Sequence, residues 1–140
     1  MTTRRVVFDT NILISALLSA TGAPFRCPAL ARSNTVLSVS CQQILREFDE
    51  KLQQKFHFVR DRAWQAVEEV RQFSELVEVP GQLQGVVTDD PDDEVILECA
   101  IRGNAAFVVT GDKHLVKLQA YRDISIIRAQ ALLELVAHGS

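Results

Sequence analysis

Short apolar runs alternate with helical stretches along almost the whole chain, and this alternation limits the folds that it can adopt. The runs are rich in β-branched residues, as expected of strands that are covered on both faces. They lie at Arg5–Phe8, Val36–Val39, Leu76–Val79, Phe107–Val109 and Ile124–Ile127. Helical patterns lie between them, at about Asn11–Ser19, Pro24–Ser33, Cys41–Lys55, Asp61–Ser74, Asp92–Arg102, Lys113–Leu118 and Ala129–Ala137.

Strand–helix alternation of this kind predicts an α/β fold with an open, mostly parallel sheet of about five strands and helices on both faces. No repeat, low-complexity tract or linker interrupts the pattern. We therefore expect one domain over residues 1–138, followed by a short tail at 139–140. Ligands bind such sheets outside the carboxyl ends of the strands, so the residues that follow each strand are the first candidates for a site.

Two of the predicted strands deliver an aspartate to that edge. Asp9 follows Arg5–Phe8 directly, and Asp112 comes shortly after Phe107–Val109. A single aspartate after a strand is more often a helix cap than a ligand. The function of these two therefore depends on what else reaches the same edge.

A glutamate borders the apolar face of the helix predicted at Cys41–Lys55. Glu47 lies about 60° outside the edge of that face at 100° per residue. The apolar face is formed by Ile44, Leu45, Phe48, Leu52 and Phe56. We therefore expect Glu47 at the rim of the buried side.

The helix that begins near Pro91 carries an aspartate on its apolar stripe. Asp93 shares a face with Ile96, Leu97 and Ala100, and a carboxylate in that position is costly unless it is hydrogen-bonded or bound to a cation. Capping explains Asp90 or Asp92. We expect three further acids to face water: Asp92, Glu94 and Glu98.

Four carboxylates, Asp9, Glu47, Asp93 and Asp112, are thus candidates for one site at the edge of the sheet. Mg²⁺ and Mn²⁺ prefer oxygen ligands of this kind. The net charge of −3 is unusual for a nucleic-acid binder, but two divalent ions would reverse its sign. Spacing alone leaves a metal site and four separate structural carboxylates about equally favoured.

The same residues lie in motifs that resemble the PIN-domain nucleases. The opening Val7-Phe8-Asp9-Thr10-Asn11 and the helical Glu47 match the first half of that family. The more specific match is the segment Asp89–Ala100 followed by Ala106–Leu115, which contains Thr110-Gly111-Asp112-Lys113. The match spans nearly the whole chain and is strongest with the PIN proteins grouped as toxins of bacterial toxin–antitoxin systems.

The resemblance implies a three-layer α/β/α fold and a metal-dependent endonuclease for single-stranded RNA, with one or two Mg²⁺ or Mn²⁺ ions. It also implies homodimers and inhibition by a small antitoxin protein. One position departs from the family. Many members have a second acid two positions after the aspartate matched by Asp112, where this chain has His114. His114 and Asp90 or Asp89 are therefore auxiliary candidates for the metal site. Without the second acid we expect weaker binding of a second metal ion.

The expected chemistry is metal-assisted hydrolysis of a phosphodiester. One ion would be held chiefly by Asp9, Asp93 and Asp112, and a second would lie nearer Glu47. Asn11 and Thr110 are candidates to orient carboxylates or water, although capping and turn formation explain them equally well. Arg46 and Lys113 are candidates for phosphate contacts, with ordinary solvated charges as the alternative.

Two other functions fit parts of the pattern. A phosphatase of the haloacid-dehalogenase type also places an aspartate after its first strand, but it needs a general acid two residues later, where this chain has Asn11. The second alternative is a PIN-like module that binds RNA or protein with little or no catalysis.

Nothing in the chain suggests export or a membrane. The apolar stretch Ile12–Leu18 is far too short to span a bilayer, and Cys27, Cys41 and Cys99 form no C-x-x-C pair. We therefore expect a cytoplasmic protein with buried free thiols.

Overall fold

A six-stranded sheet forms the centre of the computed structural model, which describes residues 3–83, 85, 88 and 90–139. The strand order is β3-β2-β1-β4-β6-β5. All neighbouring strands are parallel except β5, which pairs antiparallel with β6. The strands are β1 (Arg4–Phe8), β2 (Val36–Ser40), β3 (Ser74–Leu76), β4 (Phe107–Val109), β5 (Ala120–Tyr121) and β6 (Ile124–Ile127).

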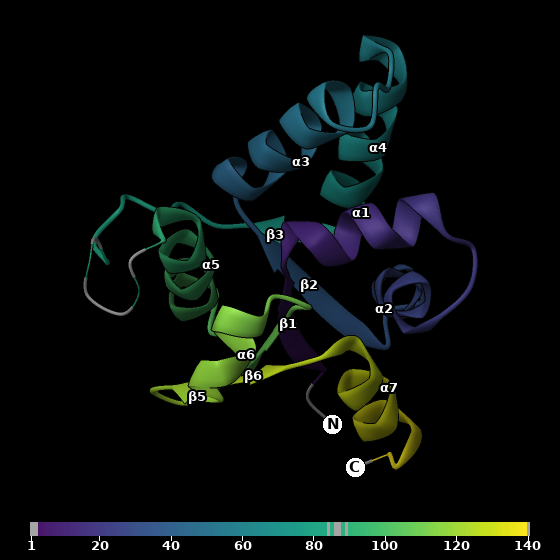
Figure 1. The fold of residues 1–140 in the computed structure, drawn as a ribbon. Helices are drawn as coiled ribbons and strands as arrows, with labels where there is room; N and C mark the ends of the chain where they lie inside the picture. Colours follow the sequence, from purple (N-terminus) through teal and green to yellow (C-terminus); the bar gives the residue numbers. More distant parts are fainter. Residues whose placement is uncertain (1–2, 84, 86–87, 89, 140) are drawn as a thin grey trace.

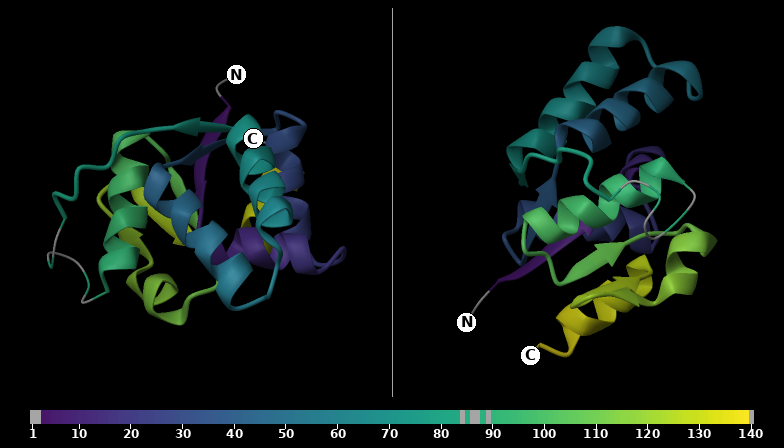
Figure 2. Two further views of the ribbon diagram at one scale, coloured as in Figure 1. Left: turned by 90° about the horizontal axis from the view of Figure 1, so that it is seen from above. Right: turned by 90° about the vertical axis from the view of Figure 1, so that its left-hand side faces the viewer.

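Helices cover the sheet on both faces, which gives the expected three layers (Figures 1 and 2). Helices α1 and α2 pack together and α7 packs on α2, while α5 contacts β1, β2 and β4 and α6 contacts β6. The α3–α4 pair stands beyond the sheet at the top of Figure 1. The helices are α1 (Thr10–Leu18), α2 (Ala23–Arg32), α3 (Gln42–Gln54), α4 (Arg60–Gln72), α5 (Pro91–Arg102), α6 (Lys113–Leu118) and α7 (Ala129–Ala137).

Two details of the sheet differ from the prediction. The third strand spans Ser74–Leu76 rather than Leu76–Val79, because the chain enters the sheet as soon as α4 ends and the hydroxyl groups of Ser38 and Ser74 hydrogen-bond at 2.7 Å. The second difference is β5, a strand of two residues that sequence periodicity cannot detect. Residues with positive φ, Gln119 and Arg122, flank it.

The two central strands, β1 and β4, are deeply buried where they pair. Val6 and Val7 of β1 and Val108 and Val109 of β4 are completely buried. Helices on both faces explain why the sequences of these strands are continuous apolar runs.

The strand order reverses between β1 and β4. Strands β2 and β3, which follow β1 in the sequence, extend the sheet in one direction, and strands β4, β6 and β5 extend it in the other.

Within the described residues, no single helix is long and apolar enough to cross a membrane. Helices α1 and α2 meet that test of length and composition only as a pair, across a bend of 101°.

The carboxyl end of α5 approaches β2 so closely that only glycine fits there. A Cβ on Gly103 would lie 2.3 Å from Cγ1 of Val39, a side chain that is fully buried. We expect Gly103→Ala to lower the free energy of unfolding by roughly 1–3 kcal/mol, since overpacking forces the backbone or the valine to move. Chemical denaturation measures this loss. In the double variant with Val39→Ala the two losses should be less than additive, whereas strict additivity would contradict the clash.

Candidate active site at the carboxyl edge of the sheet

Asp9 lies at the point where the strand order reverses. Its backbone N–H donates to the carbonyl oxygen of Val109 at 2.9 Å and so extends the pairing of β1 with β4. The Thr110 hydroxyl donates to Oδ2 of Asp9 at 2.6 Å, and both side chains are buried. Asp9 stands at the N-terminus of α1 but makes no capping hydrogen bond there. Capping therefore does not explain this aspartate.

Asp112 is connected to Asp9 through the same threonine. The backbone N–H of Asp112 donates to Oγ1 of Thr110 at 3.0 Å. Oδ1 of Asp112 accepts the N–H of His114 at 2.7 Å and so caps α6. Thr110 thus accepts from one aspartate and donates to the other, which is the arrangement expected of a residue that orients a carboxylate.

Asp93 is buried in the first turn of α5, as its place on the apolar stripe predicts. Burial raises the pKa of Asp93 most, the negative charges of Asp90, Asp112, Asp9 and Asp92 add to the effect in that order, and together they bring it to about 7. Burial also raises the pKa of Asp9, and the Thr110 hydrogen bond offsets only part of this effect. Asp9, Asp93 and Asp112 therefore share one region that holds excess negative charge.

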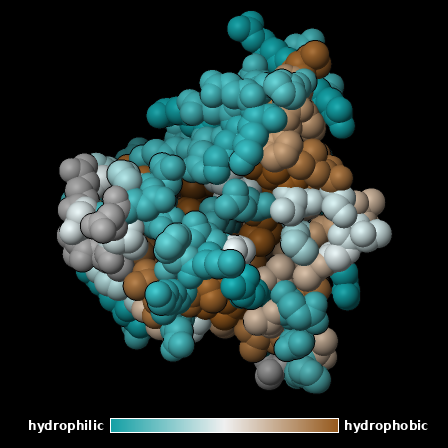
Figure 3. Space-filling view, viewed as in Figure 1, coloured by the Kyte–Doolittle hydropathy of each residue, from teal (hydrophilic) through white to brown (hydrophobic). Residues whose placement is uncertain are grey.

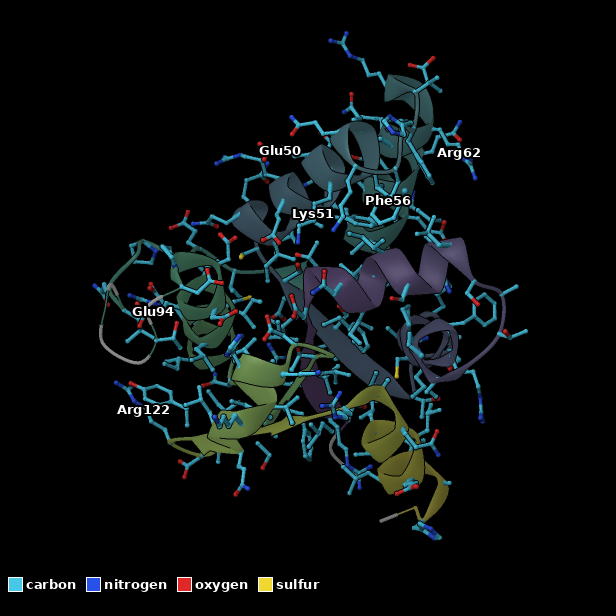
Figure 4. The ribbon with its side chains drawn as sticks, viewed as in Figure 1. Glu50, Lys51, Phe56, Arg62, Glu94 and Arg122 are labelled. Atoms are coloured by element: carbon cyan, nitrogen blue, oxygen red, sulfur yellow. The ribbon has the colours of Figure 1, made fainter. Side chains whose placement is uncertain are left out.

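Glu47 reaches the same region from α3 and pairs with a lysine that the sequence analysis missed. Nζ of Lys51 lies 2.9 Å from Oε1 of Glu47. Burial raises the pKa of Glu47 and is the largest influence on it. The hydrogen bond and the charge of Lys51 lower this pKa, and the charges of Asp92 and Asp9 raise it. Figure 4 shows Lys51 pointing from α3 toward the centre of the molecule. Its spacing of four residues from Glu47 is the signal that could have identified it.

The residues at this edge fit a hard divalent cation in donor type and charge. All four predicted ligands are carboxylates, and the raised pKa values mark negative charge that a cation would stabilise. Among the described residues, however, no three side chains of His, Cys, Asp or Glu stand close enough together to hold one ion. The carboxylates have protein partners instead: Asp9 binds Thr110, Asp112 binds the N–H of His114, and Glu47 binds Lys51.

Two acids of α5 do not face water as predicted. Glu94 and Glu98 are buried. Glu98 accepts the backbone N–H groups of Gly81, Gln82 and Leu83, and Glu94 accepts those of Gly85 and Thr88. The prediction was wrong because a helical pattern cannot show that a loop folds back over the polar side of the helix.

The other acids at the start of α5 divide between capping and the site. Asp90 accepts the N–H of Asp92 at 2.9 Å and caps the helix. Asp92 is exposed as predicted, yet it faces α3 and lines a groove of about 280 Å³ with Glu47 and Arg46. Asp89 lies outside the described residues.

The remaining candidates lie around the site on exposed positions. Asn11 is exposed in the first turn of α1, and Lys113 and His114 are exposed at the start of α6. Arg46 is also exposed and lines a second, larger hollow of about 570 Å³ together with Arg102. Figure 3 shows that the surface over α3 is largely hydrophilic.

Comparisons with known proteins identify the family and the fold. A PIN domain family model matches residues 5–114. The fold is similar to that of a chain in the crystal structure of VapBC2 from Rickettsia felis bound to a DNA fragment from its promoter. The TM-score is 0.63 and the sequence identity 14%, and the match covers 89% of this chain and 98% of that chain. It is also similar to PAE2754 from Pyrobaculum aerophilum: TM-score 0.65, 13% identity, 97% of this chain and 90% of that one. No curated protein sequence matches the chain.

The raised pKa of Asp93 predicts a stability that depends on pH. Because the folded pKa of about 7 lies above the ordinary 3.8, the folded protein holds this proton more tightly than the unfolded chain does. Stability is therefore lost as pH rises through that interval. With EDTA present, Asp93→Asn should be more stable than wild type at pH 8 by at least about 1 kcal/mol, and the difference should shrink at pH 5. Chemical denaturation at both pH values measures it, and a difference that does not change with pH would contradict the assignment.

Proposed function

Because this chain belongs to the PIN domain family, we propose that it is a divalent-metal-dependent endoribonuclease that hydrolyses phosphodiester bonds of single-stranded RNA. The observation that carries the proposal is the group formed by Asp9, Asp93 and Asp112 at the point where the strand order reverses. The charge of Asp112 raises the pKa of Asp9, and the charges of Asp112 and Asp9 raise the pKa of Asp93. Ligands bind at this place in open α/β sheets. Like charges gathered there are costly unless a cation joins them.

The proposed roles follow from the positions of the four carboxylates. Asp9, Asp93 and Asp112 would hold Mg²⁺ or Mn²⁺, which when bound activates a water molecule as the nucleophile. Thr110 holds Asp9 in one orientation through its 2.6 Å hydrogen bond. Glu47 lines a groove together with Asp92, where it would orient water or a second ion. Arg46 and Lys113 are the candidates for contacts to the RNA backbone.

The proposed biological setting is a toxin–antitoxin pair in the cytoplasm, with the protein as a homodimer and a small antitoxin as its partner. The similarity in fold to a chain of the VapBC2 structure supports this setting. A gene for a small DNA-binding protein directly beside the gene for this chain would support it further. Co-purification with that protein provides the direct test.

A second candidate function is an RNA- or protein-binding module without catalysis. The spacing of the acids favours it, because among the described residues no three side chains of His, Cys, Asp or Glu lie close enough together to hold one metal ion. The two candidates differ in their response to metal, since a binding module needs no ion at the acidic edge.

Metal should stabilise the protein if the carboxylates bind it. Mn²⁺ or Mg²⁺ should raise the melting temperature by mass action, and Asp9→Asn should reduce that response because it removes a buried ligand with little change in volume. Differential scanning fluorimetry with increasing Mn²⁺ measures the response. An equal response in wild type and Asp9→Asn would contradict the site.

RNA cleavage decides between the nuclease and the binding module. Purified protein should cut single-stranded RNA with Mg²⁺ or Mn²⁺, EDTA should stop the reaction, and Asp112→Asn should lower the rate by at least about 100-fold. His114→Ala should have a smaller effect, because imidazole is a poor ligand for Mg²⁺, and His114→Asp should raise activity with Mg²⁺ if an acid there helps to bind the ion. Cleavage that persists unchanged in both Asp9→Asn and Asp112→Asn would come from a contaminant and would overturn the proposal.

A further inference from the structure

Lys51 places a positive charge beside the acidic site. Its Nζ lies 2.9 Å from Oε1 of Glu47, and its charge lowers the pKa of both Asp9 and Glu47. The groups that act on the pKa of Asp93, apart from burial, are all acids. The lysine therefore pairs directly with Glu47 and also acts on Asp9, whereas Asp93 lies farther from its charge.

The position of Lys51 distinguishes it from an ordinary surface ion pair. Pairs four residues apart on an exposed helix contribute little and need no functional explanation. Lys51 and Glu47, however, are partly buried, with 35% and 24% of their side chains exposed. The charge of Lys51 also acts across the space between α3 and the sheet edge, on Asp9 at the end of β1. Seen from above, α3 lies between α5 and α4 (Figure 2, left), and it contacts both α1 and α5.

A second divalent ion beside Glu47 would have to compete with this ammonium group. Both would need the same carboxylate oxygens, and the two positive charges would repel one another over a few ångströms. An ammonium group can replace such an ion in neutralising the negative charge of a phosphate. It carries a compact positive charge with three N–H donors and binds phosphate oxygens directly. Nζ of Lys51 uses one donor for Oε1 of Glu47, which leaves donors for a ligand.

We propose that Lys51 is a catalytic residue that takes the place of a second metal ion and binds a non-bridging oxygen of the scissile phosphate. The inference rests on the proposed ribonuclease function and adds to it a single-ion site. Lys51 stays protonated throughout, and Glu47 keeps its ammonium group directed at the phosphate. Asp9, Asp93 and Asp112 would hold the one divalent ion, which would supply the remaining positive charge around the substrate.

Metal binding provides the first test, and it does not depend on activity. Isothermal titration with Mn²⁺ should give a single ion per wild-type chain. Lys51→Gln removes the charge and keeps most of the length, so Mn²⁺ should bind about tenfold more tightly as the repulsion disappears. Lys55→Gln is the matched control, because Lys55 lies one turn farther along the chain and is exposed, and its affinity should equal that of wild type. Two ions in wild type, or equal affinities in wild type and Lys51→Gln, would overturn the inference.

Cleavage provides the second test, with the opposite expected direction. In single-turnover assays at saturating Mn²⁺, Lys51→Gln should cut single-stranded RNA about 100-fold more slowly than wild type. Lys51→Arg, which keeps the charge, should retain most of the rate, and Lys55→Gln should be unchanged. A folding defect does not produce tighter metal binding together with slower cleavage, because it lowers both the metal affinity and the cleavage rate.

The two proposals fail in different ways. Undiminished cleavage by Lys51→Gln would overturn the role of the lysine and leave the ribonuclease in place. Wild-type protein that binds Mn²⁺ but cuts no single-stranded RNA would overturn the ribonuclease, and with it the role of Lys51.

Discussion

The parallel pairing of β1 with β4 is the contact on which the candidate site depends. These two strands belong to the two halves of the chain and meet where the strand order reverses. Their pairing continues past the strand ends through the hydrogen bond from Asp9 N–H to Val109. It therefore places Asp9 beside Thr110, about a hundred residues away along the chain, at hydrogen-bonding distance. Asp112 follows two residues later, and α5 and α3 add their carboxylates around this fixed point.

Excess negative charge at this edge destabilises the folded protein. Burial raises the pKa values of Asp9, Asp93 and Glu47, and neighbouring acids raise them further. The surrounding residues offset this cost only in part, through the Thr110 hydroxyl on Asp9 and the Lys51 ammonium on Glu47. A site that binds a cation needs such a balance, because fully neutralised carboxylates would have little affinity left for an ion.

Helix α5 serves two purposes with neighbouring acids. Asp93 faces the site, whereas Glu94 and Glu98 point away from it and accept backbone N–H groups of the segment that precedes the helix: Gly81, Gln82, Leu83, Gly85 and Thr88. Buried carboxylates are stable in that role because several backbone donors satisfy their oxygens. At its carboxyl end the helix is held against β2 by the close approach of Gly103 to Val39. Both contacts fix the rotation of α5 and hence the direction of Asp93.

The sequence by itself determined the class of fold, nearly all helix and strand positions, and the strand ends that carry Asp9 and Asp112, because these depend on local periodicity and on the general geometry of parallel sheets. It also predicted the burial of Asp93 from a single helical stripe. Only the tertiary structure decided that Glu94 and Glu98 hold a loop, that Asp92 faces α3, and that Lys51 stands among the acids. Each of these depends on which distant segment packs against a helix face, and the spacing of residues along one helix carries no information about that segment.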